Sequence, residues 1–280
     1  MPVSAAVYAN YCRELTRLSV WYARKRIVDG SSDFEDAFNK RVNIFRNTSY
    51  YTGDGHPANG DVFPQWRVLL DTVRPVFEAH IAAADTEVLE AKCLELFWPS
   101  IVERVENVGN PLPDMAERPY KSWSFDYRHE ALNIHIDNTY RPASPLVEMR
   151  DDFAACLLRM LQDSQRRRPE IGDVRCGSWL NSAPAFSALF PQAWRASGEP
   201  VVEIGYTMGF WGQFTDRRGD FHARNGQRFR ELGRLPYPCL TCRAEIRSVL
   251  DHLRSSFPNA VALNECLDVP GAGHPWQWTP

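Results

Sequence analysis

Apolar residues recur at spacings of three and four through the first third of the chain. One stripe of this kind consists of Val7, Tyr11, Leu15, Leu18 and Tyr22. The spacing predicts an amphipathic helix over residues 4–27, because it gathers apolar side chains on one helix face. Further helices are predicted over residues 34–45, 65–84 and 86–105. Residues 109–119 are rich in proline and glycine, so a helical domain is predicted over residues 1–110.

Beyond residue 120 apolar and polar residues alternate, which is the period of β-strands. The stretches 123–128 and 131–137 are separated by a short turn and are expected to pair as a hairpin. The second strand leads through a polar turn into a helix predicted over residues 147–168 and a strand at 173–179. Strand, helix and strand in this order form a βαβ unit. Later elements are predicted as a strand pair or one long bent strand over 200–214 and a helix over 240–256.

The strand at residues 131–137 has one apolar and one polar face. Leu132, Ile134 and Ile136 alternate with Asn133, His135 and Asp137. His135 and Asp137 would lie on the same side, with Cβ atoms ~6–7 Å apart. An imidazole can accept a proton from an attacking group, and a neighbouring carboxylate can orient it. The alternative is a half-buried strand whose polar face is hydrogen-bonded within the protein.

Composition narrows the classes of protein that fit this pattern. At 280 residues the chain can form two domains, and the predicted fold class is α+β, with the helical region packed on a mixed α/β domain over residues 120–280. The formal net charge of −3, from 32 basic and 35 acidic residues, argues against nucleic-acid binding. No apolar run reaches the ~20 residues that cross a bilayer, and the N-terminus lacks a signal-peptide pattern. A cytoplasmic protein that binds no membrane is expected.

The seven cysteines are scattered and odd in number, which indicates reduced thiols rather than a disulfide framework. Cys239 and Cys242 form a single CxxC motif, and a zinc ribbon would need a second pair. We expect two small residues at a strand-to-helix junction, with redox use as the alternative. No metal site is expected.

Two segments resemble the core of the GNAT-type N-acyltransferases. They are residues 140–161, YRPASPLVEMRDDFAACLLRML, and residues 174–191, VRCGSWLNSAPAFSALFP. In that family a central strand is followed by a phosphate-binding turn, a long helix, a strand that splays from its neighbour, and a short helix often beginning with asparagine. Asn181 falls where that short helix would begin. The chain also resembles a group of bacterial acyltransferase-like proteins with an HI strand and a C-x-SWL strand, matched by His135-Ile136 and residues 176–180.

The resemblance, which covers roughly residues 123–256, implies a function and a set of site residues. The reaction would move an acyl group from a CoA or acyl-carrier-protein thioester to an amine or hydroxyl of a small-molecule acceptor. His135 would be the base and Asp137 its orienting carboxylate. The donor would be held by Asn138, Tyr140, Arg141, Ser144 and Asn181.

The chain departs from the family in two places. The family's turn is glycine-rich, whereas residues 141–146 read RPASPL, and each of the two prolines removes a backbone donor. Many members use a tyrosine on the short helix as general acid, and the nearest equivalent here is Phe190. These departures leave open a catalytically inactive GNAT-like scaffold that binds an acyl carrier or a partner protein. A mononuclear non-haem iron oxygenase using His135, Asp137 and His222 is the other alternative.

Overall fold

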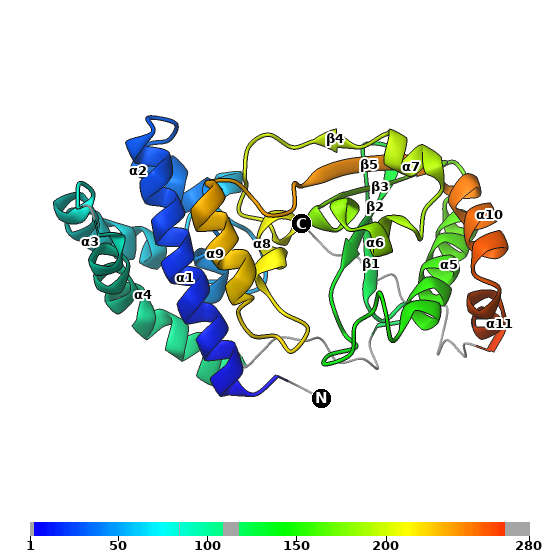
Figure 1. Ribbon diagram of the computed structural model, residues 1–280, viewed down its shortest axis with the longest axis horizontal. Helices are drawn as coiled ribbons and strands as arrows, with labels where there is room; N and C mark the ends of the chain where they lie inside the picture. Colours follow the sequence, from blue (N-terminus) through cyan, green and yellow to red (C-terminus); the bar gives the residue numbers. More distant parts are fainter. Residues whose placement is uncertain (1–2, 84, 109–117, 267–280) are drawn as a thin grey trace. The chain divides into compact units, whose positions relative to one another are not determined.

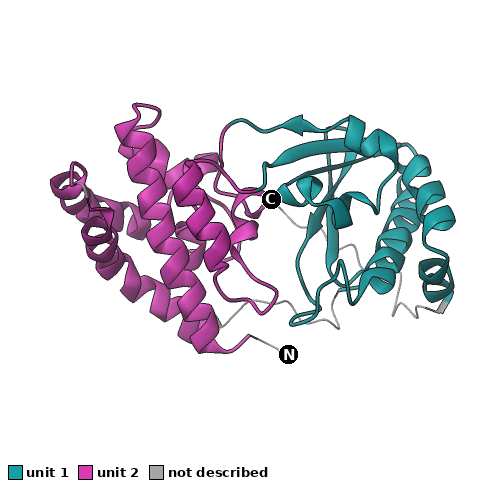
Figure 2. Cartoon of the chain, viewed as in Figure 1, with its two compact units in different colours: residues 1, 112–202, 237–279 teal, residues 2–111, 203–236, 280 magenta. Residues whose placement is uncertain are grey.

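The structure is a computed structural model that describes residues 3–83, 85–108 and 118–266. It confirms an α+β fold, with helices and a five-stranded mixed sheet. The chain divides into two compact units, which Figure 2 colours separately. Unit 1 comprises residues 112–202 and 237–279, and unit 2 comprises residues 2–111 and 203–236. The predicted division placed all of 120–280 in one domain, so it differs from the observed one in residues 203–236.

Unit 2 is built mainly from four helices of nine or more residues. They are α1 (Ala5–Val28), α3 (Pro64–His80), α4 (Thr86–Val108) and α9 (Ala223–Leu232). Helix α4 packs against both α1 and α3. The shorter elements are α2 (Phe34–Asp36), η1 (Ala37–Arg41), η2 (Phe45–Asn47), η3 (Pro57–Asn59), α8 (Met208–Trp211) and η6 (Gly212–Phe214). Figure 1 labels α1, α2, α3, α4, α8 and α9 of this unit.

Two predictions for unit 2 were wrong in detail. The helix expected over residues 34–45 stops at Arg41, because Val42 is extended. Val42, Ile44 and Phe45 are all fully buried. The strand pair expected over 200–214 is replaced beyond Pro200 by the helical turns α8 and η6.

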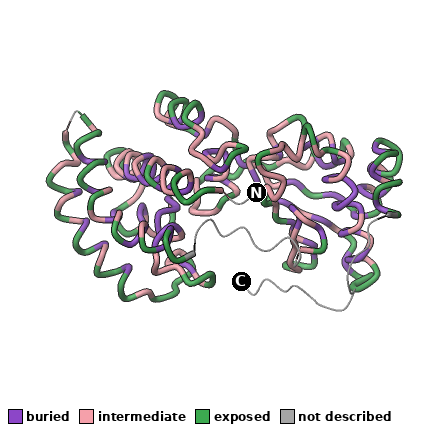
Figure 3. Tube along the Cα trace, turned by 90° about the horizontal axis from the view of Figure 1, so that it is seen from below, coloured by how far each residue is buried: buried purple, intermediate pink, exposed green. Residues whose placement is uncertain are grey.

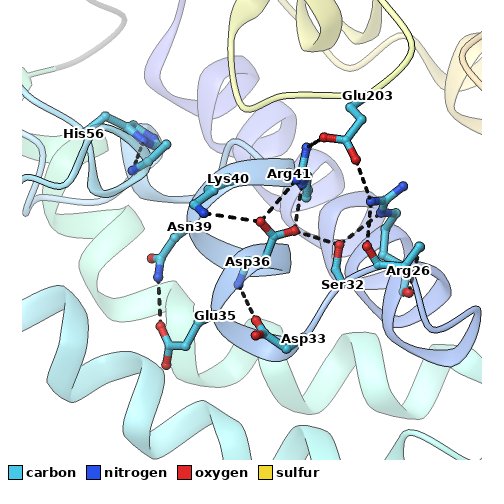
Figure 4. Close-up of polar contacts among 12 residues, drawn as sticks. Arg26, Ser32, Asp33, Glu35, Asp36, Asn39, Lys40, Arg41, His56 and Glu203 are labelled. Atoms are coloured by element: carbon cyan, nitrogen blue, oxygen red, sulfur yellow. Dashed lines mark hydrogen bonds and ion pairs between the residues drawn. The ribbon is translucent and has the colours of Figure 1, made fainter.

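Residues 203–236 are tied to the N-terminal helices by charged and aromatic contacts. The Glu203 carboxylate accepts a hydrogen bond from Arg41 Nη1 at 2.6 Å and lies 3.6 Å from Arg26 Nη2, as Figure 4 shows. The Phe229 ring centroid on α9 lies 5.1 Å from that of Tyr22 on α1. These contacts explain why the segment belongs to the helical unit.

The sheet of unit 1 has the strand order β1-β2-β3-β5-β4. Its strands are β1 (Trp123–Arg128), β2 (Ala131–Ile136), β3 (Asp173–Ser178), β4 (Glu199–Pro200) and β5 (Leu240–Glu245). The predicted hairpin is confirmed, since β1 and β2 pair antiparallel through a two-residue turn at His129 and Glu130. The βαβ unit is confirmed as well, since β3 runs parallel to β2 after helix α5 (Arg150–Arg167). Helix α5 begins three residues later than predicted.

One face of this sheet is covered by helices. They are α5, α10 (Ile246–Ser256) and α11 (Pro258–Cys266), with the shorter η5 (Trp179–Ser182), α6 (Pro184–Ser187) and α7 (Gln192–Ala196). Trp123 stacks on Phe153 at 4.3 Å between ring centroids and donates its indole N–H to the Phe153 carbonyl. Figure 3 colours the chain by burial. Along β3 the buried residues Val174, Cys176 and Ser178 alternate with less buried ones. The opposite face carries the polar residues of the strands.

The helix predicted over residues 240–256 was wrong in its first part. Residues 240–245 form strand β5, and helix α10 begins at Ile246. Along β5, Cys242 and Ala244 are buried whereas Arg243 and Glu245 are exposed, which is the strand period. Among the helices of the described residues, none has a stretch long and apolar enough to span a bilayer.

Candidate functional site

Strands β2 and β3 separate part of the way along their length. Each strand has six residues, but their parallel pairing covers only Ala131–Asn133 against Asp173–Arg175. Beyond these residues β2 remains paired with β1, and β3 remains paired with β5. The carboxyl halves of two neighbouring parallel strands therefore diverge, and this edge is where α/β sheets bind their ligands.

The register shows which backbone groups face this divergence. In an antiparallel ladder, alternate residues direct both backbone groups to the same neighbouring strand. Asp137 N donates to Ser122 O at 3.0 Å, and Ile246 N donates to Gly172 O at 2.8 Å. By this alternation, Ile136 directs its N–H and C=O groups away from β1, and Gly177 directs its own away from β5. These groups border the divergence and can bind a linear ligand that carries amides.

His135 lies beside the divergence on the open face of the sheet. Its side chain is 49% exposed, and its Nε2 lies 3.0 Å from Asp126 Oδ2 on β1. Asp126 is only 11% exposed and also receives Arg128 Nε at 3.2 Å. Partial burial by itself raises the pKa of Asp126, but the hydrogen bond from His135 and the charges of His135 and Arg128 outweigh it, so the net shift of this pKa is downwards. The ionised Asp126 therefore holds the imidazole in place.

The side chains of His135 and Asp137 have different partners in the structure. Strand β2 ends at Ile136, and Asp137 is the first residue after it. Its Oδ2 accepts a hydrogen bond from Arg118 Nη2 at 2.9 Å, and its side chain is 52% exposed. The carboxylate that contacts His135 belongs to Asp126, a residue that the sequence reasoning missed.

The turn between β2 and α5 is stabilised by its own hydrogen bonds. Asn138 Oδ1 accepts from Tyr140 N at 3.1 Å. Ser144 N donates to Glu148 Oε2 at 2.7 Å, and Ser144 Oγ accepts from Leu146 N at 3.3 Å. A carboxylate thus takes the Ser144 backbone donor that a phosphate group would need. Arg141, in the same turn, is partly exposed.

Tyr140 faces the helix-covered side of the sheet rather than the side of His135. It packs against the core, and its hydroxyl donates to Asp152 Oδ2 at 2.6 Å. Lys121 Nζ lies 2.6 Å from both Asp152 oxygens. Burial, followed by the charges of Cys156 and Asp152, raises the pKa of Tyr140. The phenol is therefore a neutral donor fixed within the fold.

Asn181 forms hydrogen bonds to three elements of unit 1. Its Nδ2 donates to Cys176 O at 2.9 Å and to Leu240 O at 2.8 Å, and its Oδ1 accepts from Trp194 Nε1 at 3.0 Å. Both amide protons are used in these bonds. The residue predicted to hold a donor molecule thus joins the end of β3, the start of β5 and α7.

Two further residues beside the divergence were missed from the sequence. Arg175 occupies the last paired position of β3, opposite Asn133 on one side and Arg243 on the other. Gly177 lies two residues further along β3, and a Cβ atom there would lie 3.5 Å from Thr241 Oγ1. The divergence is therefore bordered by a cation and by a residue without a side chain. The sequence contains a pattern that could have identified both residues: Asp173, Arg175 and Gly177 alternate with apolar residues, which places them on one face of the strand.

The cysteine motif has no metal-binding geometry. Cys239 and Cys242 are buried free thiols, and burial raises the pKa of Cys242 to about 11. Across the described part of the chain, no three His, Cys, Asp or Glu side chains are grouped to hold a metal ion. His222 belongs to unit 2, where its Nδ1 accepts from Asn225 N at the start of α9.

Comparisons of the chain with protein-family models, with curated proteins and with solved structures found no match.

Proposed function

We propose that the protein is an acyltransferase that moves an acyl group from a thioester donor to an amine or hydroxyl of a small acceptor. The observation that carries the proposal is the end of β2–β3 pairing after Asn133 and Arg175. It lies within a βαβ unit followed by a short helix, the order expected from the resemblance to GNAT-type N-acyltransferases. An amide-bearing donor arm would lie between the two strands and use the backbone groups of Ile136 and Gly177.

His135 would act as the general base. With Nε2–H directed at Asp126, the imidazole has its lone pair on Nδ1. The acceptor's nitrogen or oxygen attacks the thioester carbonyl and gives its proton to Nδ1. The tetrahedral intermediate then expels the thiolate, which takes up the proton from the imidazolium. Asp126 would orient the ring and stabilise its protonated form, in place of Asp137.

The donor is better matched by an acyl-carrier-protein thioester than by acyl-CoA. The Ser144 backbone donor is taken by Glu148, and Pro142 and Pro145 have no N–H group to offer a pyrophosphate. A carrier-bound arm has a single phosphodiester, so it needs fewer donors. Arg175, beside the divergence, supplies a positive charge for that group.

The test is thiol release from acyl-carrier and acyl-CoA donors, measured for the parent and for His135→Gln. Removing a general base lowers kcat by roughly 10²–10⁴-fold, while donor binding stays at the parent level. His129→Asn is the matched control, because His129 lies in the same hairpin at a φ of 51° that asparagine tolerates. Turnover of His135→Gln at the parent rate would rule out the base assignment.

A catalytically inactive scaffold is the second candidate. Phe190, at the position where many family members have a catalytic tyrosine, is fully buried and stacks on Trp194 at 4.1 Å. If the parent protein binds donor but releases no thiol with any acceptor, the scaffold replaces the enzyme.

A further inference from the structure

Unit 2 contains two arginines on one tyrosine ring. The guanidinium carbons of Arg46 and Arg104 lie 5.6 and 5.2 Å from the Tyr51 ring centroid. The Arg46 guanidinium also lies 5.3 Å from the ring centroid of Tyr206. Both rings are held in place, since Tyr51 Oη donates to Gly53 O at 2.9 Å and Tyr206 Oη donates to an asparagine side chain at 3.2 Å. The two cations and two aromatic rings thus form one cluster.

Neither arginine has a carboxylate partner within the described residues. Arg104 is 7% exposed and donates from Nη1 to Tyr51 O at 2.6 Å. The Nε atoms of both Arg46 and Arg104 are buried without an acceptor. Buried cations in proteins are normally paired with an anion or fully hydrogen-bonded, so this arrangement points to an anion that comes from outside the chain.

A buried histidine supplies a third unpaired donor. His56 is 1% exposed and stacks on Tyr206 with ring centroids 3.6 Å apart. Its Nδ1 accepts from Ala58 N at 3.1 Å, so the neutral ring carries its proton on Nε2. That Nε2 atom is buried and has no partner. Burial and the charge of Arg46 lower the pKa of His56 to about 3, which keeps the ring a neutral donor at physiological pH.

We propose that Arg46, Arg104 and His56 bind the phosphoryl group of a small phosphorylated ligand. Two uncompensated positive charges match a phosphate dianion, whereas one carboxylate would neutralise only half of them. Three N–H groups without acceptors match the several oxygens of a phosphoryl group. Arg46, Tyr51 and Tyr206 are partly exposed, so one side of the cluster is open to solvent. The site lies in unit 2 and does not depend on acyl transfer in unit 1.

The test is calorimetric titration of the full chain with inorganic phosphate at pH 7.5, with ionic strength held constant by potassium chloride. We expect saturable binding to a single site in the parent protein. Arg46→Gln should weaken it at least about tenfold, because a hydrogen bond between charged groups is lost. Arg74→Gln is the matched control: Arg74 stacks on Phe34 in the same unit but has the carboxylate of Glu35 as partner.

Two measurements separate a binding role from a structural one. Without phosphate, Arg46→Gln should keep a cooperative unfolding transition within a few degrees of the parent, since no ion pair is lost and only the ring contacts with Tyr51 and Tyr206 are weakened. With phosphate, only the parent and Arg74→Gln should gain thermal stability. Absence of saturable binding in the parent, or an equal loss in Arg74→Gln, overturns the proposal. Saturation by acetate without saturation by phosphate would overturn the phosphoryl assignment.

Discussion

His56 shows how burial sets the charge state of a single residue. Burial, and secondly the charge of Arg46, lower its pKa to about 3, whereas an unfolded histidine titrates near ~6.5. Between these values only the unfolded chain takes up the proton. The free energy of unfolding therefore falls as the pH falls from about 6.5 towards about 3, and the full stabilisation is present above that window.

We expect His56 alone to lower the free energy of unfolding by about 2 kcal/mol between pH 7.5 and pH 5. Urea unfolding at the two pH values, in buffer without phosphate, measures the difference. His56→Phe keeps an aromatic ring against Tyr206. Between pH 7.5 and pH 5 its free energy of unfolding should fall by about 2 kcal/mol less than that of the parent. His129→Asn, an exposed change in unit 1, should show the full loss. Equal losses in the parent and His56→Phe would contradict the assignment.

The partner of His135 shows how far the sequence leads at the residue scale. A two-residue turn at His129 and Glu130 pairs Asp126 with Asn133, and this places Asp126 diagonally across from His135. The placement of Asp126 near His135 can therefore be worked out from the sequence once the hairpin is assumed. The end of β2 at Ile136 cannot be worked out in this way, because the contact of Asp137 with Arg118 involves a residue outside both strands.

At the scale of elements, local periodicity predicted the hairpin and the βαβ unit correctly. It could not predict where β2 and β3 separate, because β1 and β5 hold the carboxyl halves of these strands. It also extended a helix over 240–245, where Cys242 and Ala244 are buried as strand residues. A stretch this short fits both the helix period and the strand period, and the pairing of β5 with β3 makes it a strand.

The divergence yields a prediction for Gly177→Val. A Cβ atom here meets only Thr241 Oγ1, at 3.5 Å, and a β-branched residue suits a strand. The melting temperature should therefore stay close to that of the parent. The new side chain lies on the open face beside the proposed donor arm, so KM for an acyl-carrier donor should rise at least about tenfold, equivalent to ~1.4 kcal/mol. Gly172→Val, before β3 and with open space around its Cβ position, should leave KM unchanged. An unchanged KM in Gly177→Val would show that the donor lies elsewhere.

For the whole molecule, the main feature missed from the sequence is the return of residues 203–236 to the helical unit. The pattern of this segment predicted strands that would continue the sheet. Its contacts are with residues more than a hundred positions earlier, such as Glu90, Arg26 and Tyr22. Local periodicity carries no information on such distant pairing, so the return of this segment to the helical unit could not be predicted from the pattern.

The Arg230–Glu90 pair tests how this segment is held in unit 2. Arg230 on α9 donates Nη1 and Nη2 to Glu90 on α4 at 2.7 and 2.9 Å, and the Glu90 side chain is 3% exposed. Arg230→Ala leaves a buried carboxylate with Arg17 at 3.7 Å as its nearest cation. We expect a loss of about 2 kcal/mol in the free energy of unfolding, measured by urea titration.

Arg228→Ala provides the control for this change, because Arg228 lies on the same helix and is exposed. This substitution should change the free energy of unfolding by no more than about 0.5 kcal/mol. If the pair fixes the returning segment, limited proteolysis should cut residues 203–236 faster in Arg230→Ala than in Arg228→Ala, because the loss of this contact makes local opening easier. Equal stability and equal cleavage in the two variants would mean that the aromatic contacts of Phe229 hold the segment without the ion pair. The packing of residues 203–236 in unit 2 would then depend on apolar burial alone.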